Sequence, residues 1–183
     1  TCFNELGWDA LNMLPLKEQD AVLNNLFSPD GDLRFSMGRI PMNANDYARN
    51  WYSCDEVPGD FRLKYFNINR DKTTLIPYIK RVQRINSDMT FWASPWSPPS
   101  WMKVNHYYSV RSKAEVNQLP VKHEIALYEG ADNVDKTFYP KQVAVNDYFI
   151  QDTRYLQAYA NYFCKFVSAY QEAGVTISRV MFQ

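Results

Sequence analysis

Apolar residues recur along the chain at two spacings, one typical of helices and one typical of strands. Helical spacing, with apolar residues three and four positions apart, covers residues 17–27, 73–85 and 152–173. Short apolar or β-branched runs, which we expect to be strands, cover residues 33–38, 89–93 and 175–183. A mixed apolar and acidic segment at 4–14 indicates a short helix ahead of them. Helices and strands alternate, which predicts βαβ units and a parallel sheet.

The two most regular helical segments each have an apolar face. In 73–85 that face is formed by Leu75, Ile76, Ile79, Val82 and Ile85. In 152–173 it is formed by Leu156, Tyr159, Ala160, Phe163, Val167 and Tyr170. We expect Asp152 to cap the second helix and Gly174 to end it. Cys164 lies beside this face, so we expect its thiol to be buried.

Aromatic and proline residues follow the strand at 89–93. Pro95 cannot continue a hydrogen-bonded ladder, so we expect the strand to end before it and a stiff loop to carry Trp96. An indole held rigidly in a loop suits a flat apolar ligand surface such as the C–H face of a sugar ring. The alternative is that the indole only packs within its own loop, and we expect this of Trp101.

Polar residues gather after the strand at 33–38, where Arg39 is followed by Asn43, Asn45 and Asp46. Conspicuous side chains placed just past parallel strands are typical of an (α/β) barrel, in which loops at the carboxyl ends of the strands build the site. A doubly wound sheet is the alternative. The chain has no GxGxxG or GxxxxGK[ST] motif, which disfavours a nucleotide-binding version of that fold.

Charge and composition narrow the class of partner. Lys plus Arg and Asp plus Glu number 20 each, so nothing indicates binding to nucleic acid or to an anionic membrane. No apolar run is long enough for a membrane-spanning helix. Aromatic residues make up 16% of the 183 residues, and carbohydrate binding is one use of such a surplus, although an aromatic-rich core would also explain it.

Cysteine and histidine do not indicate a metal or a cofactor. The three cysteines lack metal-ligand spacing, and His106 and His123 stand at no spacing typical of a metal site or a catalytic triad. The chain starts at Thr1 without the pattern of a signal peptide, so the sequence does not fix the compartment. Residues 104–150 have little regularity, and we interpret them as an insertion on the loop side of the sheet.

Three segments carry a resemblance to a known family. The segments are FSMGRIPMNANDYA at 35–48, ASPWSPPSWMK at 93–103 and SRVMFQ at 178–183. They resemble the regions after the second and third barrel strands, and the fourth strand itself, of glycoside hydrolase family 30. This is the glucosylceramidase-like family of retaining β-glycosidases. The resemblance implies a partial (β/α)8 TIM barrel, with roughly strands two to four within residues 1–183.

The resemblance also implies a function. The parent protein would be a β-glycosidase acting on β-glucosides of the glucosylceramide or β-1,6-glucan type, without a cofactor. A secreted, periplasmic or cell-surface location would suit it. In this family the acid/base and nucleophile glutamates lie beyond the position of Gln183, so we expect the 183 residues alone to be inactive. A non-catalytic carbohydrate-binding protein on the same barrel, and a β-xylosidase or xylanase of the same family, remain alternatives.

By the same resemblance, Arg39, Asp46 and Trp96 line the subsite for the sugar whose bond is cut. An aspartate can accept two hydrogen bonds from neighbouring sugar hydroxyls, although Asp46 could instead cap the short turn that follows it. The forked guanidinium of Arg39 is better suited to orient carboxylates than to contact sugar, and a structural salt bridge is its alternative. Trp96 would stack on or beside the sugar.

Overall fold

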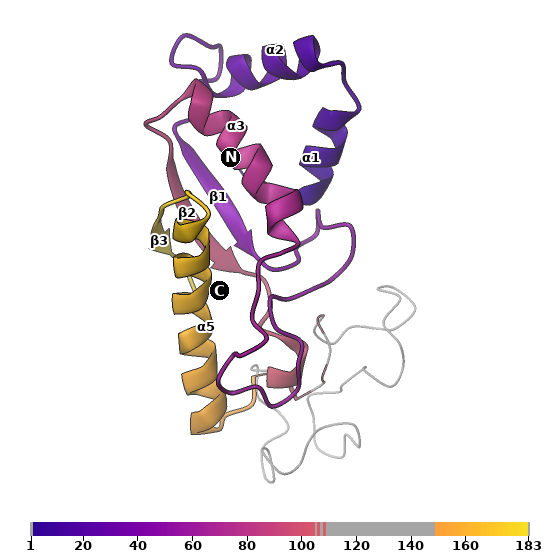
Figure 1. The fold of residues 1–183 in the computed structure, drawn as a ribbon, viewed down its shortest axis with the longest axis vertical. Helices are drawn as coiled ribbons and strands as arrows, with labels where there is room; N and C mark the ends of the chain where they lie inside the picture. The colour runs from indigo at the N-terminus through magenta and orange to yellow at the C-terminus, as the bar shows by residue number, and fades with distance from the viewer. Residues whose placement is uncertain (1, 105, 107, 109–148, 183) are drawn as a thin grey trace. The chain divides into compact units, whose positions relative to one another are not determined.

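The computed structural model describes residues 2–104, 106, 108 and 149–182 (Figure 1). The helices are α1 (Glu5–Asn12), α2 (Leu16–Phe27), α3 (Leu75–Ile85) and α5 (Thr153–Glu172), with short 3-10 turns η1 (Asp71–Thr73) and η2 (Ser100–Met102). The strands are β1 (Met37–Met42), β2 (Thr90–Pro95) and β3 (Ile177–Val180). Most of the expected insertion at 104–150 lies outside the described residues, so that interpretation stays a prediction.

The described strands form a parallel sheet in the order β1-β2-β3. Met37 of β1 lies opposite Thr90 of β2, and Phe91 of β2 lies opposite Ile177 of β3. Each connection between neighbouring strands therefore returns the chain to the same end of the sheet. This arrangement confirms the βαβ pattern predicted from the spacing of apolar residues.

Strand β1 begins and ends later than the sequence predicted. The expected strand at 33–38 was wrong, because pairing with β2 begins at Met37 and ends at Met42. The carbonyl of Arg39 accepts a hydrogen bond from the Phe3 N–H (2.9 Å), on the edge away from β2. Pro41 is two residues further on and faces the same edge, so its missing N–H removes no bond to β2. Pro95 likewise lies inside β2 rather than after it.

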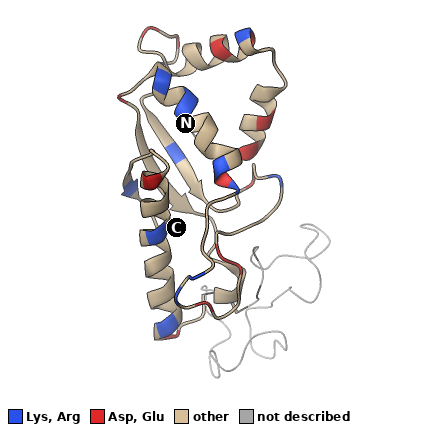
Figure 2. Cartoon of the chain, viewed as in Figure 1, with Lys and Arg blue, Asp and Glu red and all other residues tan. Residues whose placement is uncertain are grey.

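The chain forms two compact units, which we describe separately. The first unit comprises residues 1–51, 67–96 and 164–183 and contains the sheet. In it α1, α2 and α3 contact one another (Figure 1). Figure 2 shows acidic residues on α1 and basic residues on α3. Arg81 of α3 pairs with Asp20 of α2 at 2.6 Å, which joins two of these helices through charge.

One face of the sheet is covered by aromatic side chains that pack against Gly38. The ring of Phe3 lies so close to this glycine that a Cβ there would come within 2.3 Å of it. Phe3 also packs against Phe27 of α2 and Phe91 of β2, with ring centroids 5.8 Å apart in both pairs. A glycine in β1 thus lets aromatic side chains pack directly on the sheet, and this is the centre of the first unit's core.

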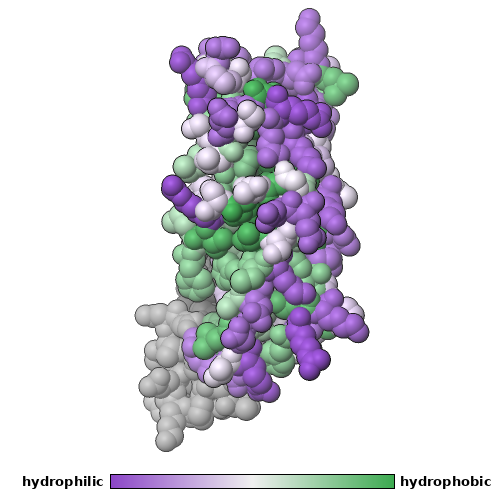
Figure 3. Space-filling view, turned by 60° about the vertical axis from the view of Figure 1, so that its left-hand side comes forward, coloured by the Kyte–Doolittle hydropathy of each residue, from purple (hydrophilic) through white to green (hydrophobic). Residues whose placement is uncertain are grey.

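The opposite face of the sheet is more open. Met37 alternates with Gly38 along β1, and its side chain is 44% exposed. Elsewhere in the first unit, Phe35, Val180 and Met181 are also exposed. Figure 3 shows apolar residues reaching the surface between hydrophilic ones in one view of the molecule. Among the residues that the structure describes, no helix combines the length and apolar character needed to cross a membrane.

Helices α3 and α5 differ in how well their spacing predicted the buried face. In α3 the buried residues are Leu75, Ile76, Ile79 and Val82, as predicted, whereas Ile85 is only partly buried. In α5 the buried residues are Ala158, Tyr159, Tyr162, Phe166 and Tyr170. Leu156 and Ala160 are exposed, and the expectation of a buried Cys164 was wrong, because its thiol lies on the solvent side of the helix. The ends of α5 are as predicted, with Asp152 Oδ1 accepting from the Arg154 N–H (2.8 Å) and Gly174 adopting φ +80°.

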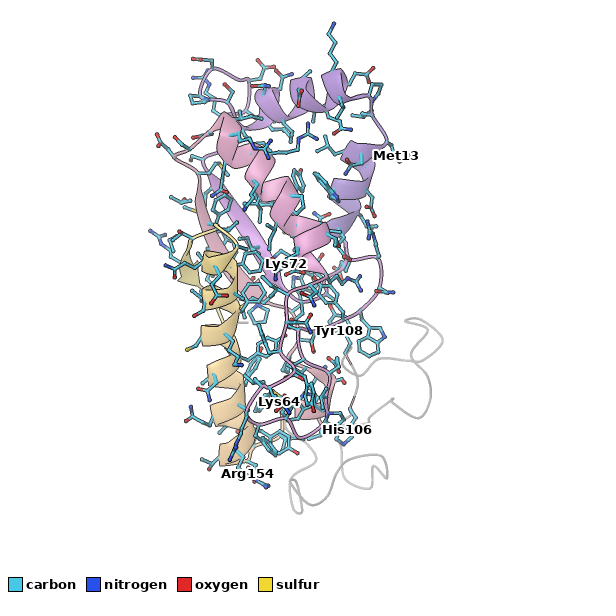
Figure 4. The ribbon with its side chains drawn as sticks, viewed as in Figure 1. Met13, Lys64, Lys72, His106, Tyr108 and Arg154 are labelled. Atoms are coloured by element: carbon cyan, nitrogen blue, oxygen red, sulfur yellow. The ribbon has the colours of Figure 1, made fainter. Side chains whose placement is uncertain are left out.

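The second unit comprises residues 52–66 and 97–163 and has an aromatic core. The ring of Phe61 lies edge-on to Trp101 at 5.5 Å and to Tyr155 at 4.9 Å. Arg154, labelled at the start of α5 in Figure 4, places its guanidinium 5.3 Å from the Phe61 ring. The segment at 52–66 has no helix or strand of its own, and these ring contacts help to fix it in this unit.

Candidate functional site

Arg39 occupies the open face of the sheet, because it alternates with the buried Gly38 and Ile40 along β1. Its register partner on β2 is Trp92, whose indole centroid is 5.4 Å from the guanidinium carbon. Arg39 Nε donates a hydrogen bond to Ser94 Oγ at 2.7 Å. The guanidinium is therefore held by two side chains from the neighbouring strand.

Trp96 comes directly after β2 and completes this cluster. Its ring centroid lies 5.7 Å from the Arg39 guanidinium carbon, so the cation contacts two indoles. Cation–π contacts of this kind contribute about 0.5–1 kcal/mol each at exposed sites. Trp96 is 43% exposed, so part of its indole remains accessible beside a fixed positive charge. This combination can hold an apolar ring face that carries polar groups at its edge.

Trp92 and Ser94 were not predicted to lie beside Arg39. The sequence contained the signal, since Trp92, Ser94 and Trp96 stand two residues apart and share one side of an extended chain. The register between β1 and β2 then decides which β1 residue meets them. Trp101 behaves as predicted: it is buried, and its Nε1 donates to the Asp55 carbonyl at 3.0 Å.

Asp46 lies in the turn that follows β1. Asn45 caps this turn, because its side-chain oxygen accepts from the Tyr47 N–H (2.8 Å) and its carbonyl accepts from the Ala48 N–H (3.0 Å). The capping role left open for Asp46 is thus taken by its neighbour. The Asp46 carboxylate is exposed, and among the described residues it has no hydrogen-bond or ion-pair partner.

The structure brings Arg39 and Trp96 into contact, whereas no contact among the described residues joins Asp46 to either of them. Asp46 and Trp96 nevertheless follow neighbouring parallel strands, and the last residues of these strands, Met42 and Pro95, lie opposite each other. Both residues therefore come after the carboxyl edge of one sheet. A shared site for all three remains a prediction.

Lys103 holds the segment after Trp96 within the second unit. The side chain is buried, and its Nζ donates to Ser97 Oγ (3.2 Å) and to the carbonyl of Tyr108, which is labelled in Figure 4. Burial lowers the pKa of Lys103 to about 7, although the nearby Glu56 opposes this shift. In the described part of the chain no group of three His, Cys, Asp or Glu side chains is arranged to hold a metal ion.

Comparison with known proteins identifies the family. Residues 2–121 match the model of the glycosyl hydrolase family 30 TIM-barrel domain. The chain belongs to glycosyl hydrolase family 30. The family predicted from the three sequence segments is thereby confirmed.

Relatives in family 30 are similar in sequence to this chain over most of its length. Putative glucosylceramidase 4 of Caenorhabditis elegans is 31% identical over 175 residues, which is 94% of this chain and 27% of the relative. Lysosomal acid glucosylceramidase of Mus musculus is 29% identical, covering 91% of this chain and 26% of the relative. Endo-1,6-beta-D-glucanase of Neurospora crassa is 27% identical, covering 94% and 29%. The chain therefore spans between a quarter and a third of these relatives' length.

Solved structures show the same fold. The endo-beta1,6-glucanase BT3312 superposes with a TM-score of 0.69 at 23% identity, over 100% of this chain and 33% of that one. The catalytic domain of GH30 xylanase C from Talaromyces cellulolyticus gives a TM-score of 0.59 at 20% identity, over 97% and 34%. At these identities the likeness concerns the fold alone. It confirms a partial TIM barrel, with the parallel strands β1, β2 and β3 forming part of the barrel wall.

Proposed function

We propose that the gene product containing these 183 residues is a retaining β-glycosidase that hydrolyses β-glucosides, of the glucosylceramide or β-1,6-glucan type. The observation that carries this proposal is the cluster of Arg39, Ser94 and Trp96 at the carboxyl edge of the sheet, where barrel enzymes place their sites. The family supports a carbohydrate substrate. Relatives named as glucosylceramidases and an endo-1,6-glucanase support glucose as the sugar.

Each residue has a role that its surroundings support. The partly exposed indole of Trp96 would stack on the C–H face of the sugar. Asp46 would accept hydrogen bonds from two neighbouring hydroxyls, since its carboxylate is not used by the turn that carries it. Arg39 is fixed by two indoles and Ser94, so it would orient a carboxylate at the reacting centre rather than follow the sugar.

These three residues bind and orient, and the chemical step needs two further carboxyl groups. In a retaining mechanism one carboxylate attacks the anomeric carbon while the other protonates the leaving oxygen and later activates water, with the two about 5–5.5 Å apart. We place both groups outside residues 1–183, as the resemblance implies. The 183 residues alone are therefore expected to hydrolyse no glycoside.

Two alternatives can be separated by simple observations. If the two codons after Gln183 encode Asn-Glu, as in the family, the enzyme is supported. Loss of that glutamate supports a carbohydrate-binding protein on the same barrel. The likeness to a xylanase structure also keeps β-xylosides as candidate substrates. Comparing kcat/KM on an aryl β-glucoside and an aryl β-xyloside decides between them, and we expect the glucoside to react faster.

The site is tested by Asp46→Ala and Trp96→Ala in the gene product. Each substitution should lower kcat/KM by ~10²-fold or more, because hydrogen bonds and stacking that strengthen in the transition state are lost. Asp30→Ala and Tyr65→Ala serve as matched controls, since both residues are exposed and neither belongs to the proposed site. Near-normal rates for both site variants would show that Asp46 and Trp96 are structural.

A further inference from the structure

The turn that carries Asp46 is anchored to helix α1. The Leu6 N–H in the first turn of α1 donates to the carbonyl of Tyr47 at 3.0 Å. Arg49 pairs with Asp9 of α1 through two guanidinium nitrogens, one of them Nε at 2.7 Å from Oδ2. Helix α1 thus holds the residues that immediately follow Asp46 through hydrogen bonds and an ion pair.

Glu5 lies at the centre of this anchor. It is 1% exposed, and its Oε2 accepts from the backbone N–H of Arg49 at 2.9 Å. Arg70 donates to both of its oxygens, at 2.7 Å from Nε and 2.6 Å from the second nitrogen. Arg70 also donates to the side chain (2.5 Å) and the carbonyl (3.3 Å) of Asn50. One buried carboxylate therefore fixes Arg49 directly and Asn50 through Arg70.

The carboxylate of Glu5 is charged when it does this. Burial alone would raise the pKa of Glu5, but the bonds from Arg70 and from the Arg49 N–H outweigh burial and lower the pKa below its usual value. Hydrogen bonds to an ionised acceptor are stronger than neutral ones. A charged Glu5 thus holds the two arginines more firmly than an uncharged side chain of the same shape.

The other side of the turn is also constrained. β1 ends at Met42, and Asn43 follows it, buried and with φ +76°, a conformation that asparagine adopts more readily than most residues. Asn45 then closes the turn onto Tyr47. Asp46 thus stands in a short span with the sheet at one end and the Glu5 anchor at the other.

We propose that Glu5 is a positioning residue for Asp46. The proposal rests on the proposed function in one respect, that Asp46 holds the sugar. By holding Arg49 and Arg70, Glu5 keeps the turn in the geometry in which the Asp46 carboxylate meets substrate. A displacement of 1 Å in a substrate-binding group such as the Asp46 carboxylate can lower the rate by about 10²-fold. Loss of the hydrogen bonds to Glu5 should therefore lower the rate, although Glu5 does not touch substrate.

A double-mutant cycle in the gene product tests this. Glu5→Gln should lower kcat/KM on an aryl β-glucoside by ~10-fold, and Asp46→Asn by ~10²-fold. The double variant should be no slower than Asp46→Asn alone, because Glu5 acts only through Asp46. Multiplying effects, or an unchanged rate for Glu5→Gln, would overturn the proposal. Asp20→Asn is the matched control, since it removes the carboxylate of an ion pair elsewhere in the first unit and should leave the rate unchanged.

Hydrogen exchange separates this proposal from the proposed function. Glu5→Gln should speed exchange of the Arg49 amide by about tenfold or more while amides of α3 stay protected. If Asp46→Asn is fully active, the proposed site is wrong, and exchange alone then decides whether Glu5 anchors the turn. An unchanged rate of hydrogen exchange at the Arg49 amide in Glu5→Gln would contradict the anchoring role of Glu5. Should Glu5→Gln not fold, Asp9→Asn, which weakens the exposed part of the anchor, should show the same non-additivity at about two- to threefold.

Discussion

Glu5 and Asp55 are both buried carboxyl groups, at 1% and 3% exposure, but their surroundings are opposite. Glu5 accepts hydrogen bonds from Arg70 and from the Arg49 N–H. Asp55 Oδ1 accepts from the Val57 N–H at 3.1 Å, whereas its Oδ2 has no hydrogen-bond partner among the described residues. The two groups lie in different units of the chain, so each is set by its own neighbours.

The comparison shows that burial does not by itself decide whether a carboxyl group is charged. Burial raises the pKa of Asp55 to about 6, the carboxylates of Asp60 and Glu56 add to the increase, and the Val57 N–H bond only partly opposes it. For Glu5 the same effect of burial is outweighed by a guanidinium and a backbone N–H, and its pKa is lowered. The direction of the pKa shift of each buried carboxyl group therefore follows from the groups that contact it.

The largest expected effect tests the charged member of this pair. Glu5→Gln should lower the free energy of unfolding by about 3 kcal/mol at pH 7, the lower end of the range for removing one partner of a buried ion pair, because Arg70 is partly exposed. Urea unfolding of the gene product measures this. Asp9→Asn breaks an exposed pair with Arg49 and should cost no more than about 1 kcal/mol. Equal losses of unfolding free energy in the two variants would mean that the buried ion pair of Glu5 contributes no more than the exposed pair of Asp9.

Two buried tyrosines of α5 extend the comparison at a smaller scale. Tyr170, in the first unit, donates to the buried carboxylate of Asp71 at 2.7 Å. Tyr162, in the second unit, accepts from the Cys54 N–H at 2.7 Å. Tyr170→Phe should cost about 2 kcal/mol and Tyr162→Phe about 1 kcal/mol, since a bond to a charged group contributes more than a neutral one. Thermal unfolding of both variants gives the order, and a reversed order would contradict the reasoning.

The sequence predicted those features that depend on local periodicity. The buried face of α3 follows from Leu75, Ile76, Ile79 and Val82, and the parallel sheet follows from the alternation of elements. Helix α5 was harder, because it has two apolar stripes. The stripe through Leu156, Ala160 and Cys164 competed with the one through Tyr162 and Phe166 that the fold buries.

The partners of buried polar groups could not be predicted in this way. Trp96 could be placed after a strand from the sequence, whereas Arg39, expected just past its strand, lies within β1. The contact between the two depends on the register of β1 against β2. Glu5 meets Arg49 and Arg70, far from it in the sequence, and nothing in the first helical segment distinguishes its carboxylate from a solvated one. The charge of such a buried group depends on residues that are distant in sequence, and local sequence patterns do not show which residues these are.

The smallest expected effect tests Asp55, the carboxyl group with the raised pKa, through pH. Its pKa of about 6 in the folded chain exceeds its ordinary value of 3.8, so the folded state binds an extra proton between these values. Its contribution to stability is therefore complete below about pH 4 and is lost as the pH rises through 6. Asp55→Asn keeps an oxygen for the Val57 N–H and gives Asp60 an N–H in place of a negative neighbour.

The variant should accordingly be more stable than the unmodified protein at pH 7.5 and no more stable at pH 4. A pKa difference of about two units corresponds to about 3 kcal/mol at full value, and relaxation of the surroundings together with water penetration reduces the expected gain to about 1 kcal/mol. Glu5→Gln should behave in the opposite way, because a carboxylate with a lowered pKa stabilises the fold only while it is ionised. Its cost should shrink as the pH falls below about 4. Urea unfolding of both variants from pH 3 to 7.5 measures the two trends, and parallel trends would mean that the partners of these two carboxyl groups do not set their charge.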